Sequence, residues 1–442
     1  MNAKAWIVAV DMGYGHQRAA HPLRFLSPTG KVVLANNYDG MPHGDRRIWE
    51  NSQKFYEFFS RAKNLPLIGN FLFDILIDKM QAILSFYPRR DLSAPNLQVK
   101  MNYAGIKKGW GRDLVDYLNT KNIPLITTFF TVAFMAEEHG FKGDIYCVVC
   151  DSDISRAWAP YNPQNSRIKY LAPCRRVVER LKEYGVKFEN IYLTGFPLPD
   201  ENLGGKNLLK LKKDLAERVV NLDPEHRYRQ KYIGTIKQFL TGVNLKSHHH
   251  HPLTLTFAVG GAGAQRSIGL SILKSLRKKI LDNEIKLNLI AGTRRDVYEY
   301  FTDYIKSLDL DKRLNKNLFV LFSVDKEDYF KKLNDLLRST DILWTKPSEL
   351  VFYTALGLPI IIAPPLGSQE KFNKIWLKTV GAGISQEDPR LTAEWLFDWV
   401  NSGWLAEAAM SGFLDGRQFG VHNIMDVVFR GVKEPAKNYQ LL

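Results

Sequence analysis

LTLTFAVGGAGAQRSI, residues 253–268, joins an apolar strand-like run to a glycine-rich turn and then to the start of a helical pattern. A strand that ends in a glycine turn at the mouth of a helix presents backbone N–H groups and the positive end of the helix dipole at one place. Such a place suits a phosphate or pyrophosphate. Near the N-terminus, WIVAVDMGYGHQ (residues 6–17) repeats the arrangement. The two turns predict two nucleotide-type domains that face a shared cleft.

Short apolar runs alternate with helical segments in both halves of the 442 residues, which predicts an α/β fold with two Rossmann-like, doubly wound parallel sheets. The first domain is predicted over residues 1–200, and a lysine-rich helical connection and linker over 201–251. The second domain is predicted over 252–395, followed by helices over 396–442 that pack across the hinge. The expected strands lie within residues 6–10, 31–35, 125–129, 145–150, 168–172, 191–194, 253–259, 287–291, 318–322, 342–344 and 359–363.

The charge balance favours an anionic partner. Lys and Arg number 61 against 46 acidic residues, a formal net charge of +15, and nucleic acid, anionic lipid and sugar nucleotides all fit that balance. Nucleic acid is the least favoured, because the basic residues are scattered along both halves and no nucleic-acid-binding motif occurs. The stretch from Arg46 to Arg90 mixes basic and aromatic side chains, which fits either docking on an anionic membrane surface or buried core helices.

Three cysteines in a long chain fit a reducing compartment, so we expect a cytoplasmic protein whose membrane contact, if any, is peripheral. Cys147 and Cys150 lie in a strand-like run and are expected to be buried structural residues. Residues 248–251 are four consecutive histidines, but no carboxylate or cysteine cluster accompanies them. We therefore expect no metal site there.

Several segments resemble the GT-B glycosyltransferases of the MurG and monogalactosyldiacylglycerol synthase type, and they follow one another in the family's order. In the second half they are GGAGAQ (260–265), TKPSE (345–349), ALGLP (355–359), GSQEKFN (367–373) and GAG (381–383). In the first half they are GYGHQRAA (13–20) and GFP (195–197). Each motif alone is a weak signal, whereas the ordered set is fairly specific.

The resemblance implies an enzyme that transfers a hexose or N-acetylhexosamine from a nucleotide diphosphate sugar, such as a UDP-sugar, to an acceptor hydroxyl. In the family the acceptors are lipid or lipid-linked. The resemblance also implies inversion of the anomeric centre without a bound metal or other cofactor. Two alternatives stay open: a nucleotide-sugar 2-epimerase or hydrolase of the same fold, and a sugar-nucleotide-binding protein without catalysis.

Donor binding is assigned to the second half. The glycine turn is expected to hold the diphosphate, and the resemblance assigns Gln369 and Glu370 to hydroxyls of the donor sugar, with Asn373 in support. The family's ribose-binding glutamate matches Phe352 here, and Glu349, three residues upstream, is predicted to take its place. The predicted donor set is Gly260, Gly261, Gly263, Ala264, Ser348, Glu349, Gln369, Glu370 and Asn373.

Catalysis is assigned to the first half, where Gly13 and Gly15 shape the acceptor-side turn. His16 is predicted to take the proton of the acceptor hydroxyl, because neutral imidazole is a suitable base near pH 7. The alternatives are that His16 contacts the diphosphate or only caps the turn. Asp11 is a second candidate for the base or for orienting His16. Asp151 follows another strand and is a third candidate, although capping of a helix is an equal alternative.

Overall fold

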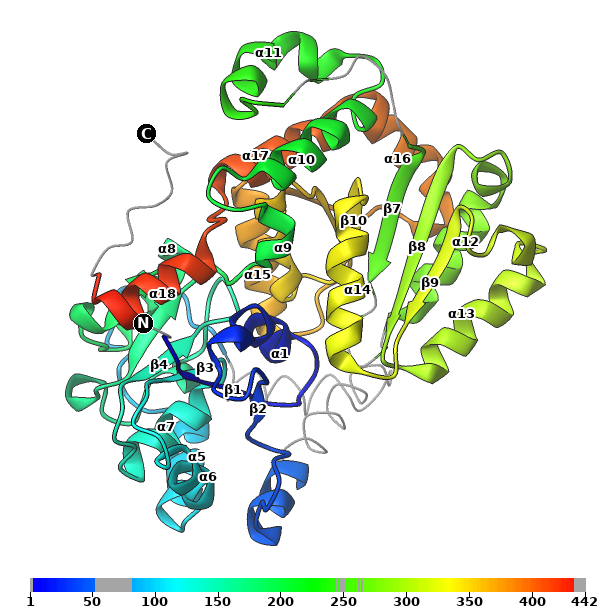
Figure 1. Ribbon diagram of the computed structural model, residues 1–442. Helices are drawn as coiled ribbons and strands as arrows, with labels where there is room; N and C mark the ends of the chain where they lie inside the picture. Colours follow the sequence, from blue (N-terminus) through cyan, green and yellow to red (C-terminus); the bar gives the residue numbers. More distant parts are fainter. Residues whose placement is uncertain are drawn as a thin grey trace. The chain divides into compact units, whose positions relative to one another are not determined.

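The computed structural model of the protein describes residues 3–51, 82–243, 245, 251–258, 260, 263 and 265–432. The chain forms two compact units (Figure 1). Unit 1 contains the chain up to Leu198, the segment Leu366–Asn373 and the chain from Phe419 to the end of the described residues. Unit 2 contains Pro199–Pro365 and Lys374–Gln418.

Unit 1 is built on a six-stranded parallel sheet with the strand order β2-β1-β3-β4-β5-β6. Its strands are β1 (Trp6–Ala9), β2 (Val33–Leu34), β3 (Leu125–Thr127), β4 (Ile145–Val148), β5 (Lys169–Ala172) and β6 (Ile191–Leu193). Its helices include α1 (Gly15–Ala20), α5 (Leu97–Lys107), α6 (Arg112–Leu118), α7 (Phe130–Glu138), α8 (Arg175–Glu183) and α18 (Gly420–Arg430). β1 and β4 are buried along their whole length, as parallel strands covered on both faces usually are.

The last described helix completes the core of unit 1. α18 places Val421, Ile424 and Val427 in one apolar cluster with residues of β1, β3 and β4, and Figure 1 shows this helix in red beside those strands. A Cβ on Gly420 would lie 2.0 Å from the carbonyl oxygen of Phe196, so only glycine permits this approach. The helices expected to pack across the hinge are thus divided, because α16 (Thr392–Asn401) and α17 (Trp404–Asp415) belong to unit 2.

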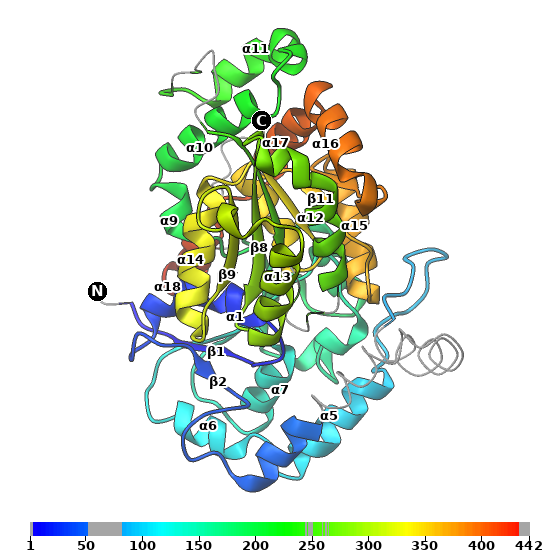
Figure 2. The same ribbon diagram turned by 90° about the vertical axis from the view of Figure 1, so that its right-hand side faces the viewer.

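Unit 2 has a second six-stranded parallel sheet, with the order β12-β11-β10-β7-β8-β9. Its strands are β7 (Leu253–Ala258), β8 (Ile285–Gly292), β9 (Leu318–Phe322), β10 (Ile342–Thr345), β11 (Ile360–Ile362) and β12 (Gly383–Ser385). Between them lie α12 (Arg266–Leu281), α13 (Arg295–Ser307), α14 (Lys326–Arg338), the 3₁₀ helix η7 (Glu349–Leu356) and α15 (Ser368–Thr379). α12 and α13 lie side by side against β8 (Figure 2). The two predicted Rossmann-like sheets are confirmed, and the cleft between them stays a prediction.

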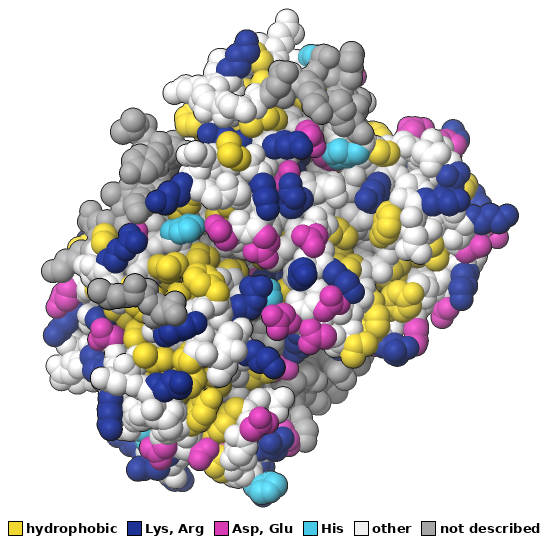
Figure 3. All heavy atoms as spheres, in the orientation of Figure 1, with side chains coloured by type: hydrophobic (Ala, Val, Ile, Leu, Met, Phe, Trp, Pro, Cys, Tyr) yellow, Lys and Arg dark blue, Asp and Glu magenta, His cyan; other side chains and the backbone are white. Residues whose placement is uncertain are grey.

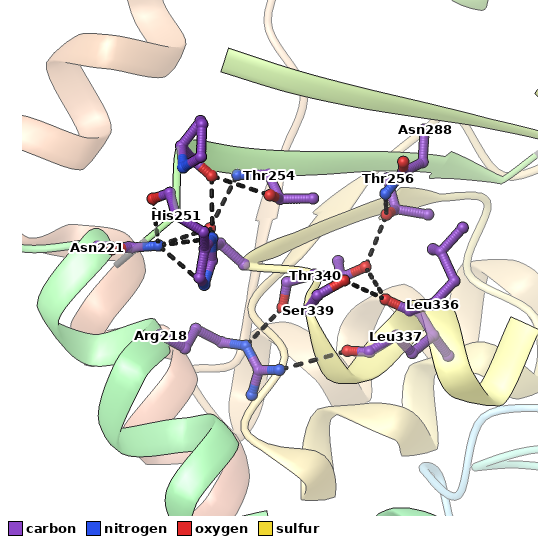
Figure 4. Close-up of polar contacts among 12 residues, drawn as sticks. Arg218, Asn221, His251, Thr254, Thr256, Asn288, Leu336, Leu337, Ser339 and Thr340 are labelled. Carbon is purple, nitrogen blue, oxygen red and sulfur yellow. Dashed lines mark hydrogen bonds and ion pairs between the residues drawn. The ribbon is translucent and has the colours of Figure 1, made fainter. Parts of the chain in front are cut away.

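The segment predicted as a connection is part of unit 2. It forms α9 (Asp200–Leu203), α10 (Leu209–Asn221) and α11 (Arg227–Phe239). The buried guanidinium of Arg218 donates to the carbonyl oxygens of Thr340 and Leu337 at 2.8 and 3.4 Å (Figure 4). It also donates to the carbonyl oxygen of Leu356 at 2.9 Å. These bonds tie α10 to the loops of the second sheet, so α10 is packed as part of unit 2.

A polar cluster lies where the chain enters β7. Asp341 is fully buried and accepts from the backbone N–H of Thr254 at 2.8 Å and from Asn221 Nδ2 at 3.1 Å. His251, the member of the histidine tract within the described residues, has its Nδ1 3.7 Å from Asp341 Oδ2. The same nitrogen lies 3.1 Å from Asn221 Nδ2 (Figure 4). Burial raises the pKa of Asp341 to about 6, although the neighbouring His251 acts in the opposite direction. Among the described residues no group of three or more His, Cys, Asp or Glu could hold a metal ion.

Basic and acidic side chains are interspersed on the face shown in Figure 3, as the scattered sequence pattern predicts. No helix in the described part of the chain combines the length and hydropathy of a membrane span. Cys147 and Cys150 are buried free thiols, as predicted, and burial raises the pKa of Cys147. Most of the stretch from Arg46 to Arg90 lies outside the described residues.

Candidate functional site

The glycine turn after β7 lies against a lysine from the neighbouring strand. β7 and β10 pair in parallel, with Ala258 opposite Thr345, so the residues that follow both strands meet at the carboxyl edge of the sheet. A Cβ on Gly260 would lie 2.4 Å from Cε and 3.4 Å from Nζ of Lys346. The stem of Lys346 therefore crosses directly over Gly260, and its ammonium group lies at the turn. Open α/β sheets bind their ligands at this edge.

The turn itself is tight. The backbone N–H of Gly263 donates to the carbonyl oxygen of Gly260 at 2.8 Å, and Gly263 has a φ of +67°, which favours glycine. Gln265 Nε2 donates to the carbonyl oxygen of Pro364 at 2.7 Å and joins the turn to the loop after β11. Gly261 and Ala264 of the predicted donor set lie outside the described residues.

The predicted ribose position is mostly buried. Ser348 precedes η7, and Glu349 is its first residue, 8% exposed. Because η7 is a 3₁₀ helix with three residues per turn, Glu349 and Phe352 lie in one row along it. Phe352 packs its ring on Trp376, 5.1 Å between centroids, and is a core residue. The predicted shared face of Glu349 and Phe352 is therefore present, whereas ribose binding by Glu349 stays a prediction.

In unit 1, His16 is the second residue of α1 and is held at the end of β3. Its Nδ1 donates to the carbonyl oxygen of Thr128 at 2.7 Å, and Thr128 Oγ1 donates back to the carbonyl oxygen of His16 at 2.9 Å. Since a carbonyl oxygen only accepts, Nδ1 carries the proton and Nε2 is the basic nitrogen of the neutral ring. The rings of Phe129 and Trp158 lie 4.9 and 6.3 Å from the imidazole.

The turn before α1 is fixed by its backbone. Gly13 has a φ of +100°, which strains any residue with a side chain. Asp11 precedes it, and its backbone N–H donates to Asn36 Oδ1 at 2.7 Å while Asn36 Nδ2 donates to its carbonyl oxygen at 3.2 Å. This reciprocal pair joins the ends of β1 and β2. Gly15 is the first residue of α1.

Asp151 lies in the loop after β4 and contacts a residue far along the chain. Asn373 Nδ2 donates to Asp151 Oδ1 at 2.9 Å, and Asn373 Oδ1 accepts from the backbone N–H and the hydroxyl of Ser152 at 2.7 and 2.8 Å. The family resemblance assigns Asn373 to donor binding in the second half of the chain. The structure places it in unit 1, because these bonds join the first turns of α15 to the loop after β4.

The next acidic residue, Asp153, has a structural role. Arg180 holds its carboxylate in a bidentate ion pair at 2.7 and 2.9 Å, and Arg176 donates to it at 2.9 Å. Asp153 and Arg180 are both buried. Asp151, by contrast, is only half-buried. Of the two acidic residues in this segment, Asp153 is thus a buried ion-pair partner, and Asp151 is a partly exposed carboxylate.

Gln369 and Glu370 lie in the first turn of α15. Glu370 Oε2 accepts from the backbone N–H of Leu366 at 2.7 Å, so this carboxylate closes the loop before the helix. Both side chains are half-buried. They belong to unit 1 with His16 and Asp151, whereas Gly260, Gly263, Ser348 and Glu349 belong to unit 2.

Two residues that contact predicted site residues, Lys346 and Thr128, are absent from the predicted set. Lys346 appears in the sequence analysis only within the motif TKPSE. Its position directly after β10, the strand that pairs with β7, could have indicated that it lies near the glycine turn. Thr128, whose carbonyl oxygen orients His16, carries no signal, because any residue supplies a backbone carbonyl.

A curated protein and several solved structures are similar to this chain. No family model matches the chain. The curated "Processive diacylglycerol beta-glucosyltransferase" of Bacillus pumilus (strain SAFR-032) is 22% identical over 392 residues, 87% of this chain and 83% of that protein. Similar solved structures include MurG from Acinetobacter baumannii, with a TM-score of 0.47, 12% identity and coverage of 97% of this chain and 99% of that one. Another is the UDP-GlcNAc 2-epimerase from Neisseria meningitidis, with a TM-score of 0.44, 10% identity and coverage of 75% and 82%.

Both TM-scores are low, so the assignment depends on the aligned sequence and on the protein's own topology. The alignment covers most of both units, and each unit carries the predicted parallel sheet. The resemblance to GT-B glycosyltransferases of the MurG and monogalactosyldiacylglycerol synthase type, inferred from the motifs, is confirmed.

Proposed function

We propose that this chain, a relative of GT-B glycosyltransferases, transfers a sugar from a nucleotide diphosphate sugar to an acceptor hydroxyl. The observation that carries the proposal is the hydrogen bond from His16 Nδ1 to the carbonyl oxygen of Thr128. It leaves Nε2 as the nitrogen that accepts a proton, and neutral imidazole is a suitable base for a hydroxyl near pH 7.

In the proposed step, the acceptor oxygen bonds to the anomeric carbon while the bond from that carbon to the diphosphate oxygen breaks. His16 takes the hydroxyl proton, and the nucleotide diphosphate leaves with the bonding electron pair. Attack opposite the leaving group inverts the anomeric centre. In this proposal Asp151 orients the acceptor hydroxyl, Asp11 supports His16, and Gln369 and Glu370 bind the donor sugar.

The departing diphosphate gains negative charge, which fixed N–H dipoles and cations stabilise. We assign this role to the turn at Gly260 and Gly263 and to the ammonium group of Lys346, whose stem crosses the turn. Glu349 is proposed to bind the ribose. The proposal includes no bound metal.

The aligned relative is named for a diacylglycerol acceptor, and we propose a lipid or lipid-linked acceptor here as well. α5 supports peripheral docking on an anionic membrane at the cytoplasmic face. Its sequence, LQVKMNYAGIK, has no acidic residue, and its exposed face combines Leu97 and Met101, 58% and 57% exposed, with Lys100 and Lys107. Apolar side chains among lysines are typical of helices that lie in a membrane interface.

The test is a thermal-shift screen of UDP-, GDP- and ADP-sugars, followed by turnover with and without diacylglycerol acceptors. A true donor at a hundred times its dissociation constant adds about 2.7 kcal/mol to the free energy of unfolding. The variant His16→Ala should bind the donor normally and lose about 10²- to 10⁴-fold in kcat. Turnover of the donor that does not need an acceptor would support an epimerase or hydrolase instead, and donor binding without any turnover would support a binding protein.

A further inference from the structure

The side chain of Asn373 is fully buried, and three hydrogen bonds of 2.7 to 2.9 Å engage both ends of its carboxamide. The backbone N–H of Ser152 only donates, so the atom that it contacts must be the amide oxygen. The orientation of the amide is therefore assigned, and its nitrogen faces Asp151 Oδ1. The carboxamide of Asn373 thus points toward Asp151 and Ser152 in the loop after β4.

We propose that Asn373 is a positioning residue, which sets the carboxylate of Asp151 for the acceptor and does not bind the donor sugar. This inference rests on the proposed function, in which Asp151 orients the acceptor hydroxyl. It replaces the role in sugar binding that the family resemblance suggested for Asn373.

The surroundings of Asp151 fit such a role. Its neighbours in the loop are anchored separately, since Cys174 Sγ donates to the carbonyl oxygen of Ser152 at 3.3 Å and Arg180 holds Asp153. The loop that follows Asp151 is thus anchored at two successive residues. The bond from Asn373 Nδ2 in turn restrains Oδ1 of the Asp151 carboxylate.

Asn373 also fixes part of α15. Gln369 precedes Asn373 by four residues and Glu370 by three, so all three lie on neighbouring parts of one helix face. Anchoring Asn373 to the loop after β4 holds the turn that carries Gln369 and Glu370. One buried amide thereby links the predicted sugar-binding pair with the predicted acceptor-binding carboxylate.

The experiment measures the pH dependence of kcat, the KM for the donor and the thermal stability of Asn373→Asp. Two carboxylates at hydrogen-bond distance do not both ionise at neutral pH. The pH at which kcat falls to half of its maximum on the acidic side should therefore rise by at least one unit. The donor KM should stay within about twofold. The matched control is Asn423→Asp, which changes another fully buried asparagine of unit 1, bonded to the Thr194 carbonyl oxygen at 2.8 Å. It should lower stability and leave the profile unchanged.

If Asn373→Asp does not fold, the double variant Asp151→Asn with Asn373→Asp exchanges the two groups and keeps the hydrogen bond between them. We expect it to regain stability and to show the low kcat of Asp151→Asn alone. A raised donor KM with an unmoved pH profile would overturn the inference and restore the sugar-binding role, as would a double variant with normal kcat. Failure of the proposed function is a separate result, because the unaltered protein would then bind and turn over no nucleotide sugar.

Discussion

Replacing Lys346 with methionine tests the proposed diphosphate site most directly. Methionine keeps an apolar stem over Gly260 and removes the ammonium group that lies at the turn. We expect the fold to persist and the affinity for nucleotide diphosphates to fall.

The magnitude follows from the position of the charge. Two unit charges about 4 Å apart interact by about 4 kcal/mol at an effective dielectric constant of about 20. Desolvation offsets part of this, and hydrogen bonds to charged groups contribute about 1.5–3 kcal/mol net. Because the lysine stem already lies against Gly260, less side-chain entropy is lost on binding. The expected loss of affinity is about 10- to 150-fold.

Gly260→Ala provides an independent second variant. The added Cβ would lie 2.4 Å from Cε of Lys346, and the flexible end of the lysine has to move away. The affinity of Gly260→Ala for nucleoside diphosphates should fall, as that of Lys346→Met does. The double variant Gly260→Ala with Lys346→Ala should bind them no more weakly than Lys346→Ala alone. The assay is calorimetric titration with a nucleoside diphosphate at two salt concentrations.

The matched control is Lys278→Met, which removes one positive charge from the exposed surface near the other end of α12. It should bind as the unaltered protein does. The reasoning is refuted if Lys346→Met binds nucleoside diphosphates normally, or if the effects of Gly260→Ala and Lys346→Ala simply add.

Three further outcomes are expected. Gly420→Ala should lower the free energy of unfolding by about 1–3 kcal/mol or more, because its Cβ would lie 2.0 Å from the carbonyl oxygen of Phe196, and denaturant titration measures this loss. Burial raises the pKa of Asp341 from 3.8 to about 6 in the folded protein, so the folded state binds more protons between these values and stability falls as pH rises through them. Thermal unfolding from pH 4 to 7 should show this decline, and Asp341→Asn should lack it; an equal decline in both would contradict the assignment. Lys100→Glu with Lys107→Glu should abolish sedimentation with anionic phosphatidylglycerol vesicles, while unchanged sedimentation would exclude α5 as the docking surface.

Much of the fold was predictable because buried parallel strands appear as short apolar runs between helical segments. Each of the eleven expected runs overlaps a strand, from β1 to β11. β12 was missed, because Gly383–Ser385 is a short edge strand that begins with glycine and pairs only with β11. Local pattern carries little information about such a strand.

The candidate site was predictable where a motif stands at a strand end and unpredictable where distant residues meet. His16 and Asp151 follow strands as expected, but the partner of Asp151 is 222 residues away. No periodicity reveals that Asn373 contacts Asp151, or that α18 contacts β1. The row shared by Glu349 and Phe352 was expected from helical spacing, and the 3₁₀ form of η7 strengthens it.

The division of the chain has a consequence for biosynthesis. Val421, Ile424 and Val427 contribute to a cluster whose other buried members lie between Ala5 and Leu171. The ribosome makes residues 199–418 between β6 and α18, which takes on the order of 10–40 s at about 5–20 residues per second. During that interval the apolar surface that α18 covers in the folded protein is not yet covered by this helix. We therefore expect a nascent chain to expose this apolar surface until α18 emerges, and a product that ends before Phe419 to be prone to aggregation.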